Sequence, residues 1–334
     1  MSKPLLTRRQ RLARTAGSAT FAVALGAWAA FYPHGNDAVS TPTTTTSPPI
    51  DSSSSSSTPK DTLAPGPSPT NANIGTPVST ATFATGSCLA FAPTSGDKHL
   101  TVFLDAGHGG PDPGGQGVTE SGTAIQEREM LLPVVLDAAT QLRAKGFRVV
   151  VSRTTNGPVV RLQPRDVKNG LFTLSGNHRD IAARAICANL AQASALVSIH
   201  YNVGASPKNA GALSSYDAAR PFSAQNKQLA TLLQSAIIAG YHAVTDWNIP
   251  DSGVIRDDNV GNAISTEASN YGHLLILGPA KAGYFTTPSL MPGALIEPLF
   301  LTDPFEGTIA ASTKGQHILA TSVAKAVTAF LAPS

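Results

Sequence analysis

The stretch TVFLDAGHGG, residues 101–110, combines the pattern of a strand with that of a binding site. An apolar run, Thr101–Leu104, passes into an acidic residue, a histidine and a cluster of glycines. This order is typical of a buried strand that ends where the backbone must approach another group closely, because glycine has no side chain to obstruct it. The stretch therefore predicts a strand over 101–106 that delivers His108 to a functional site.

Outward from this stretch, strand-like and helix-like segments alternate. Apolar residues at three- and four-residue spacing predict helices over 125–145, 179–193, 223–239 and 313–331. Short apolar runs predict further strands over 148–152, 195–199, 212–216, 274–277 and 294–300. This alternation indicates an α/β fold, a single domain with a mostly parallel sheet flanked by helices on both faces.

The first quarter of the chain does not have the composition of a domain. Met1–Arg14 carries five basic residues, residues 15–32 are uncharged and rich in Ala and Gly, and Ala27–Ala29 resembles a small-residue cleavage site. Basic, then apolar, then small is the pattern of an export signal. Residues 15–32 also approach the length that crosses a bilayer. We therefore assign 1–33 to a signal peptide or to an uncleaved membrane anchor, and the sequence leaves both open.

Residues 34–82 are mostly Ser, Thr and Pro, including the run SSSSSS. A segment of this composition buries too little apolar surface to offset the entropy lost on ordering. We therefore expect 34–82 to be a disordered linker, with a reach of ~40 Å if it is flexible. The folded, catalytic domain is then expected over 83–334.

Charge and cysteine content narrow the partners and the compartment. The net charge is only +3, so no basic surface for nucleic acid is expected. The chain has two cysteines, Cys88 and Cys187, which in an exported protein predict an intrachain disulfide; two buried free thiols are the alternative. We expect an exported monomer, located outside the cell or at the cell wall, with anchoring through 15–32 as the alternative to release.

Two histidines follow predicted strands at equivalent positions. His108 comes after the strand at 101–106, and His200 comes after the strand at 195–199. Ligands of parallel sheets collect beyond the carboxyl ends of the strands, so both imidazoles are expected at one site. Two histidines and one carboxylate, with a fourth position open, are a sufficient ligand set for catalytic Zn²⁺. Histidines without this placement include His34, His178, His242, His273 (although it abuts the strand expected at 274–277) and His317.

Two glutamates are candidates for the carboxylate chemistry. Glu127 stands near the start of the first helix, in QEREM, where the helix dipole alone would favour an acid and where Glu129 is a close competitor. Glu297 lies inside the apolar run PGALIEPLF, where a carboxylate is costly unless it is paired or serves a site. The chain contains no short metal motif such as H-E-x-x-H, so spacing alone does not identify a metal site.

Four sequence blocks occur in an order that resembles a known family. They read LDAGHGGPDPGG, EREMLLPVVLDAATQLRAKGFRVVVSR, RAICANLAQASALVSIHYN and PGALIEPLF. Together they resemble the zinc-dependent N-acetylmuramoyl-L-alanine amidases with an amidase-3 type domain, which are cell-wall hydrolases. The resemblance covers roughly residues 100–331, which is nearly the whole predicted folded part.

The resemblance implies residue roles, a cofactor and a reaction. It implies one Zn²⁺ per chain held by His108, Glu127 and His200, with Glu297 as the catalytic residue. Glu127 is favoured over its neighbour because Leu132 falls on the leucine that the family has five residues later. The implied partner is peptidoglycan, and the bond cut is the amide between N-acetylmuramic acid and L-alanine of the stem peptide.

Further positions match or depart from the family pattern. Arg184 and Asn189 match an arginine and an asparagine that we expect to be structural, and Asn202 matches the asparagine after the S-I-H motif. Leu131 and Asp303 stand where asparagine is usual, but neither is a ligand position. The segments 156–178 and 257–290 are longer than usual, and the segment after His200 leaves little room for the inserted blocking helix of some relatives.

Other functions stay open at this point. A zinc peptidase acting within the stem peptide would use the same ligand set. A non-catalytic cell-wall-binding or activator protein on the same fold is a second alternative, against which the four filled chemical positions count. The linker alone would also suit a structural surface tether.

Overall fold

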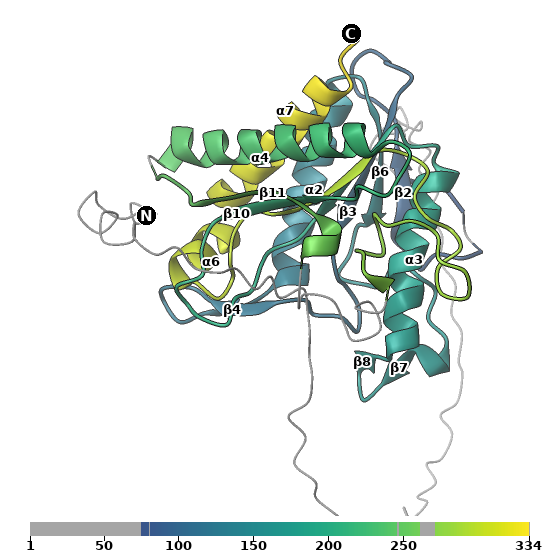
Figure 1. The fold of residues 1–334 in the computed structure, drawn as a ribbon, viewed down its shortest axis with the longest axis horizontal. Helices are drawn as coiled ribbons and strands as arrows, with labels where there is room; N and C mark the ends of the chain where they lie inside the picture. Colours follow the sequence, from purple (N-terminus) through teal and green to yellow (C-terminus); the bar gives the residue numbers. More distant parts are fainter. Residues whose placement is uncertain (1–74, 80, 246, 261–270, 334) are drawn as a thin grey trace, which may run out of the picture. The chain divides into compact units, whose positions relative to one another are not determined.

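The computed structural model describes residues 75–79, 81–245, 247–260 and 271–333. Within this part of the chain one sheet of eight strands forms the centre of the fold (Figure 1). Its strands, in spatial order, are β1 (Thr76–Pro77), β2 (Ser87–Phe91), β6 (Arg148–Arg153), β3 (Thr101–Ala106), β9 (Ala195–Ile199), β12 (Gly293–Glu297), β10 (Ala212–Tyr216) and β11 (Asp251–Arg256).

The four central strands of the sheet are parallel. β3 pairs in parallel with β6 on one side and with β9 on the other, and β9 continues in parallel to β12. The outer strands differ: β2 is antiparallel to β6, and β10 is antiparallel to β12 but parallel to β11. The predicted α/β fold with a mostly parallel sheet is confirmed.

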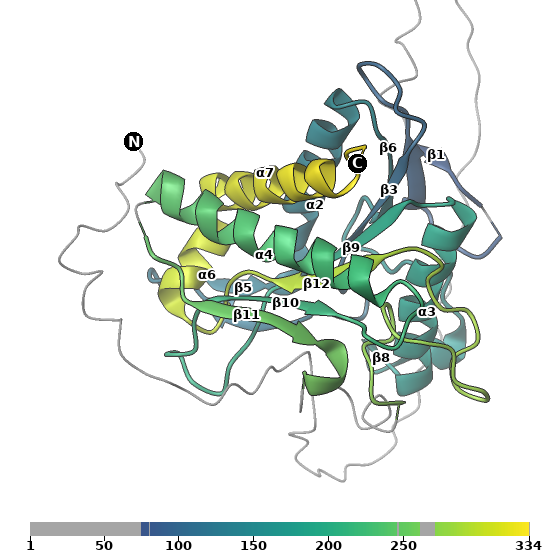
Figure 2. The ribbon, with the colours of Figure 1, turned by 45° about the horizontal axis from the view of Figure 1, so that its top comes forward.

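Helices cover both faces of the sheet. On one face lie α2 (Glu127–Ala144), α4 (Ser223–Thr245) and α7 (Thr313–Phe330), and on the other lies α3 (Leu174–Leu190) (Figure 2). Successive residues of β3 point to opposite faces. Val102 and Leu104 therefore pack with α2, α4 and α7, whereas Phe103 packs with α3.

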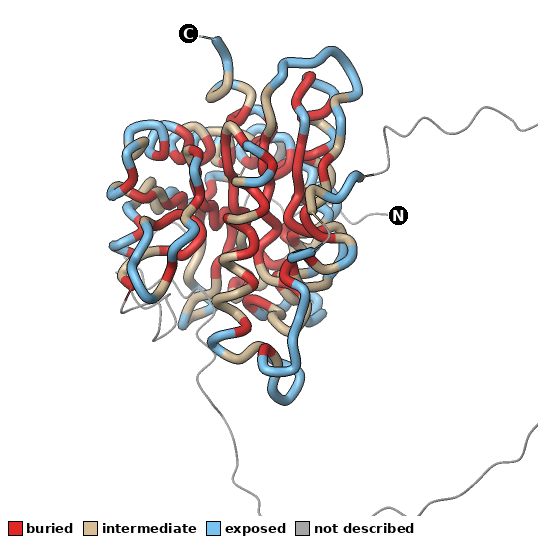
Figure 3. The backbone as a smooth tube through the Cα atoms, turned by 90° about the vertical axis from the view of Figure 1, so that its right-hand side faces the viewer, coloured by how far each residue is buried: buried red, intermediate tan, exposed pale blue. Residues whose placement is uncertain are grey.

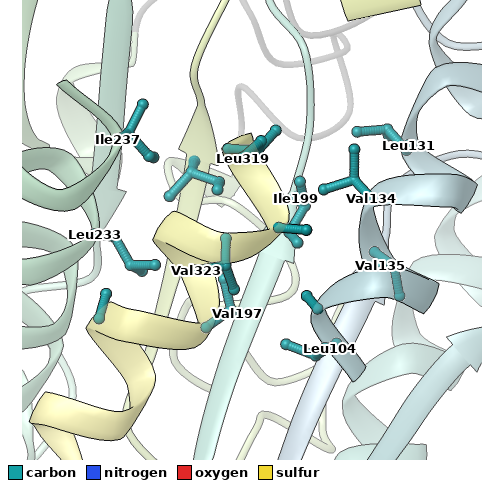
Figure 4. Close-up of a cluster of buried hydrophobic side chains, with 14 of the residues drawn as sticks. Leu104, Leu131, Val134, Val135, Val197, Ile199, Leu233, Ile237, Leu319 and Val323 are labelled. Carbon is teal, nitrogen blue, oxygen red and sulfur yellow. The ribbon is translucent and has the colours of Figure 1, made fainter. Parts of the chain in front are cut away.

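The core under α2, α4 and α7 is aliphatic. Figure 4 shows leucine, isoleucine and valine side chains of these helices meeting those of β3 and β9, among them Leu104, Val197 and Ile199. The buried segments run through the middle of the fold, while exposed segments form its margins (Figure 3). This packing holds the strand ends rigidly and so positions the side chains that follow them.

Smaller elements connect the main ones. They are β4 (Gln116–Val118), β5 (Ala124–Gln126), η3 (Pro164–Asp166), β7 (Val167–Lys168), β8 (Leu171–Phe172), η4 (Asp257–Asn259) and α6 (Pro304–Ala311). The long segment 156–178 folds into η3, β7 and β8, and Asp166 in it ion-pairs with Arg179 of α3. Asp303, a departure from the family pattern, caps α6 by accepting hydrogen bonds from the backbone N–H groups of Phe305 and Glu306.

The predicted disulfide is confirmed. It joins Cys88 of β2 to Cys187 of α3, with a Cα–Cα distance of 5.8 Å across a sequence separation of 99 residues. Both residues are fully buried. A cross-link that closes a loop of this size stabilises the fold by about 4.7 kcal/mol in the chain-entropy model. The disulfide fastens the antiparallel side of the sheet to the helix beneath it.

Two predictions about secondary structure are corrected. Leu274–Leu277 is not a strand: the backbone N–H groups of Leu277 and Gly278 both donate to the carbonyl of Leu274, at 3.0 and 2.8 Å, which closes a turn. The segment is apolar because its side chains pack into the core on the α3 side. The second helix begins at Leu174 rather than at residue 179, because the Thr173 side chain caps it by accepting from the N–H of Gly176 at 3.0 Å.

The predicted export or anchor segment, 1–33, lies outside the described residues, as does the predicted linker up to residue 74. The described chain begins inside the range expected as linker. There β1 pairs antiparallel with β2, and the N–H of Val78 donates to the carbonyl of Cys88 at 3.0 Å. The sheet therefore starts several residues before the expected boundary at residue 83. Among the described helices, none combines the length and the apolar character needed to cross a membrane.

Candidate functional site

Three of the predicted site residues meet at the carboxyl ends of β3 and β9. Nε2 of His108 lies 3.0 Å from Oε2 of Glu127, the first residue of α2. Nδ1 of His200 lies 3.1 Å from Nε2 of His108 and 3.1 Å from Oε1 of Glu127. The two strand ends and the helix start thus bring one donor atom of each histidine and both carboxylate oxygens to a common point.

The donor set and its spacing fit a zinc ion. Tetrahedral zinc with bonds of about 2.0–2.1 Å separates neighbouring ligand atoms by about 3.3 Å. The measured separations of 3.0–3.1 Å approach that value. With one ligand atom from each of the three residues, a fourth vertex stays open for water or substrate, which is the arrangement of catalytic rather than structural zinc.

The electrostatics of the three residues call for a cation. Burial alone would raise the pKa of Glu127, but His108 and His200 outweigh it and hold the pKa below its usual range. Burial alone would lower the pKa of His108, but Asp112 and Glu127 outweigh it and raise the pKa to about 10. The carboxylates of Asp112 and Glu127 thus favour a positive charge at this site, and a divalent ion would supply it while displacing that proton.

The backbone around His108 adopts an uncommon conformation. His108 has a φ of 58°, in the left-handed region that non-glycine residues rarely occupy. Two buried arginines hold the surrounding carbonyls: Arg184 donates to Ala106 and His108, both at 2.7 Å, and Arg153 donates to Gly107 at 2.9 Å. These bonds offset the strain, which typically amounts to about 1–3 kcal/mol, and fix the imidazole in place.

Arg184 is itself held by two buried carboxylates. Its guanidinium donates to Asp105 at 2.7 Å and to Asp180 at 2.8 Å. Burial would lower the pKa of Arg184, but these two carboxylates outweigh it and raise the pKa above its usual range. The structural position expected for Arg184 is thus observed, whereas the equally buried Arg153 was not anticipated from the sequence.

Asp112 is a site residue to which sequence reasoning gave no role. Its Oδ2 lies 2.8 Å from Nδ1 of His108, and its Oδ1 accepts from the N–H of Gly114 at 2.9 Å. A carboxylate on the far nitrogen of a metal-binding histidine fixes its tautomer and strengthens it as a ligand. The available signal was its place four residues after His108 in GHGGPD.

Glu297, the predicted catalytic residue, lies next to His200 in the sheet. Ile296 pairs with Ile199 across parallel strands, and the N–H of His200 donates to the carbonyl of Ile296 at 2.9 Å. The Glu297 side chain is 1% exposed, and its Oε2 accepts from Nδ2 of Asn202 at 3.0 Å. Its Oε1 has no hydrogen-bond partner among the residues that the structure describes. Burial, with a smaller contribution from the charge of Glu127, raises the pKa of Glu297 to about 8.

The other candidates lie away from this site. Glu129, the competitor of Glu127, is exposed on α2, and Leu131 belongs to the core. The Asn189 side chain binds the backbone of the long segment before β12. Its amide group donates to the carbonyl of Pro288 at 3.0 Å, and its oxygen accepts from the N–H of Leu290 at 2.8 Å. This is the structural role expected for it.

None of the described histidines outside the pair joins the three-residue site. His34 lies outside the described residues, and His99, His242 and His317 are exposed. His178 packs against the rings of Tyr284 and Phe285. His273 belongs to a separate cluster.

Comparison with known proteins agrees with the geometry. Residues 102–329 match the model of the amidase-3 family, described as N-acetylmuramoyl-L-alanine amidase. The chain is 26% identical over 226 residues to a germination-specific N-acetylmuramoyl-L-alanine amidase of Bacillus subtilis, covering 68% of this chain and 77% of the relative. It is 24% identical over 246 residues to the N-acetylmuramoyl-L-alanine amidase AmiC of Neisseria meningitidis, covering 70% of this chain and 53%, about half, of that relative.

A solved structure supports the fold. The CwlD amidase of Clostridioides difficile, in complex with the GerS lipoprotein, superposes with a TM-score of 0.50 at 19% identity, covering 70% of this chain and 98% of the other. The family match spans well over half of this chain and includes all four predicted site residues. The chain belongs to the amidase-3 family of N-acetylmuramoyl-L-alanine amidases.

Proposed function

We propose that this chain is a zinc enzyme that hydrolyses the amide bond between N-acetylmuramic acid and L-alanine of the peptidoglycan stem peptide. His108, Glu127 and His200 would hold one zinc ion per chain, and Glu297 would move the proton. When bound, zinc supplies a Lewis acid that lowers the pKa of water towards about 7 and polarises a carbonyl.

Glu297 acts first as a general base and then as a general acid. Its Oε1 accepts a proton from the attacking water while the water oxygen bonds to the amide carbon. The C–N bond then breaks, and Glu297 returns the proton to the departing nitrogen of L-alanine. Asn202 holds the other carboxylate oxygen at 3.0 Å, so Oε1 keeps its orientation throughout.

The observation that carries this proposal is the unpartnered Oε1 of Glu297. A buried carboxylate oxygen without a hydrogen bond among the described residues is unfavourable unless a reaction uses it. Burial raises the pKa of Glu297 to about 8, so a proton is held and released near neutral pH. A general acid or base is most effective when its pKa lies close to the working pH.

We further propose that the enzyme works outside the cell on the cell wall. The buried disulfide between Cys88 and Cys187 suits an oxidising, extracytoplasmic environment. The basic and apolar N-terminal segment and the Ser/Thr/Pro-rich stretch after it suit export followed by tethering. The substrate itself is inferred from the family, because no residue spacing identifies the amide bond.

The test is digestion of purified peptidoglycan by the full chain, with and without a chelator, followed by mass analysis of the products. We expect free stem peptides with intact L-alanine amino termini, loss of their release on chelation, and recovery when zinc is added back. Fragments cut within the stem peptide would identify a zinc peptidase instead. Absence of any product under all conditions would favour a non-catalytic wall-binding or activator protein.

A further inference from the structure

A second group of metal-binding side chains lies apart from the candidate active site. Asp217 directly follows β10, Asp257 begins η4 directly after β11, and His273 lies in the segment before β12. Nδ1 of His273 is 2.9 Å from Oδ2 of Asp217 and 3.3 Å from each carboxylate oxygen of Asp257. We call these three residues the edge cluster.

The edge cluster is buried, and its carboxylates are oriented by the backbone. Asp217 and Asp257 are 0% exposed, while the His273 side chain is 19% exposed. Oδ1 of Asp217 accepts from the N–H groups of Ala219 and Arg220 at 2.7 and 2.8 Å. Oδ2 of Asp257 accepts from the N–H of Leu274 at 3.1 Å. These bonds hold the two carboxylates facing one imidazole.

One carboxylate oxygen points at His273 without making a hydrogen bond to any described residue. Oδ2 of Asp217 is buried and makes no hydrogen bond with any described residue, although Nδ1 of His273 lies 2.9 Å away. Its short distance to a donor nitrogen without hydrogen-bond geometry is the relation expected of two ligands that share an ion. The ligand atoms of the edge cluster lie within 4.8 Å of one another, as do those of His108, Glu127 and His200.

The cluster holds more carboxylates than imidazoles, and the guanidinium charges of Arg220 and Arg256 also act on these carboxylates. Two carboxylates face one imidazole, so even a protonated His273 leaves one negative charge in a buried site. The nearby Arg220 donates to the carbonyls of Gly278 and Ser289, and Arg256 pairs with Asp258.

We propose that Asp217, Asp257 and His273 form a second, structural site for a divalent transition-metal ion of the zinc type. The imidazole decides the class of ion. Ca²⁺ and Mg²⁺ take oxygen ligands, whereas Zn²⁺ accepts one imidazole and two carboxylates. The exposed side of His273 provides the route by which the ion enters.

The position of the edge cluster separates it from catalysis. β10 is antiparallel to β12, and Leu213 pairs with Glu297. Asp217 lies four residues further along the chain, which at the rise of an extended strand is roughly 13 Å away. The ion would join the ends of β10 and β11 to the long segment that leads into β12. It would thereby stabilise the fold rather than take part in the reaction.

The test is a zinc count on the full chain without a histidine tag, stripped with a chelator and re-equilibrated with zinc alone. We expect two zinc ions per chain in the wild type, one in His273→Gln and one in His200→Ala. His317→Gln is the control, because His317 lies on the surface with a single carboxylate, Asp137, at 2.6 Å. It should keep both ions.

His200→Ala leaves the edge cluster intact. Zinc binding by this variant therefore still tests the edge cluster if His273→Gln folds poorly. Added zinc should raise the melting temperature of His200→Ala but not that of the double variant with His273→Gln. One ion in the wild type and none in His200→Ala would overturn the edge cluster and leave the proposed active site standing. One ion in the wild type and none in His273→Gln would support the edge cluster and contradict zinc at the active site.

Discussion

Gly107 and His200 approach so closely that no side chain fits between them: a Cβ atom on Gly107 would lie 2.3 Å from Cε1 of the imidazole. Gly107, the first residue after β3, therefore packs directly on the imidazole of His200, the first residue after β9. This close approach lets His200 reach the same point as His108, which is the next residue after Gly107. The glycine is required by the geometry of the site and not by a turn, since its φ is not positive.

Gly107→Ala should therefore displace the His200 ring and weaken zinc binding and amidase activity together. The clash is with a ring that we propose as a zinc ligand, and a ring that moves away from Gly107 would also move away from His108 and Glu127. Zinc content and product release would be measured on the same preparation. Gly96→Ala is the control, because a Cβ there meets nothing within 4 Å although its φ of 63° is strained. Normal zinc affinity in Gly107→Ala would contradict the packing.

Glu127→Gln and Glu129→Gln form a matched pair two residues apart on one helix. Glu127 faces both histidines, whereas Glu129 is exposed. We expect Glu127→Gln to lose zinc at the active site and all measurable activity, because an amide is a poor ligand and brings no negative charge. Glu129→Gln should behave as the wild type. Equal zinc affinity of the two variants would remove Glu127 from the ligand set.

Glu297→Gln should keep zinc and the fold but lose activity by about 10²–10⁴-fold, the usual contribution of a general base. The amide keeps the size of the side chain and its contact with Asn202 but does not accept the water proton. Release of stem peptides and zinc content together check this expectation. Glu120→Gln, at an exposed position on the loop between β4 and β5, is the control. Activity near that of the wild type in Glu297→Gln would show that another group moves the proton.

Asp112→Asn should lower zinc affinity by about 10–100-fold, the effect usual for carboxylates that hydrogen-bond a metal-binding histidine. The change removes the charge beside Nδ1 of His108 while keeping the shape and the bond from Gly114. Competition with a chromophoric chelator would measure the affinity. Activity at saturating zinc should fall much less than affinity. An unchanged affinity would mean that the backbone alone orients the ring.

Much of this arrangement could be predicted from local sequence. The apolar runs before His108 and His200 indicate parallel strands whose carboxyl ends coincide, and the structure brings both imidazoles together there. Glu297 could be predicted as a site residue because burying a carboxylate inside an apolar run is unfavourable unless it is paired or serves a site. Each of these inferences depends on residues close together in the chain.

What could not be predicted depends on contacts between distant segments. Arg153 ends a strand and reads as a surface residue, yet it is buried against the carbonyls of Ala106 and Gly107. Leu274–Leu277 has the composition of a strand, but its backbone forms a turn and its apolar side chains pack into the core. The edge cluster likewise joins three segments that no short motif connects. Periodicity reports which face of an element is buried but not which distant backbone lies against it.

The buried state of Glu297 also predicts how the metal-free protein responds to pH. Burial raises the pKa of Glu297 from 4.5 to about 8, so the folded state favours the neutral carboxyl. The contribution of the neutral Glu297 carboxyl to the free energy of unfolding is fully present below pH 4.5 and is lost as pH rises through about 8. Between these values the wild type should lose about 1.4 kcal/mol of unfolding free energy per pH unit relative to Glu297→Gln.

Urea denaturation of both metal-free proteins from pH 5 to pH 9 would measure this difference. Other titrating groups are present in both proteins, and folded His108, with its pKa of about 10, keeps its proton over most of this pH range. The two stability curves should therefore separate progressively up to about pH 8 and then run parallel. Curves that stay parallel over the whole range would mean that Glu297 is solvated in the metal-free protein. Its unpartnered oxygen would then no longer support a role as the proton carrier.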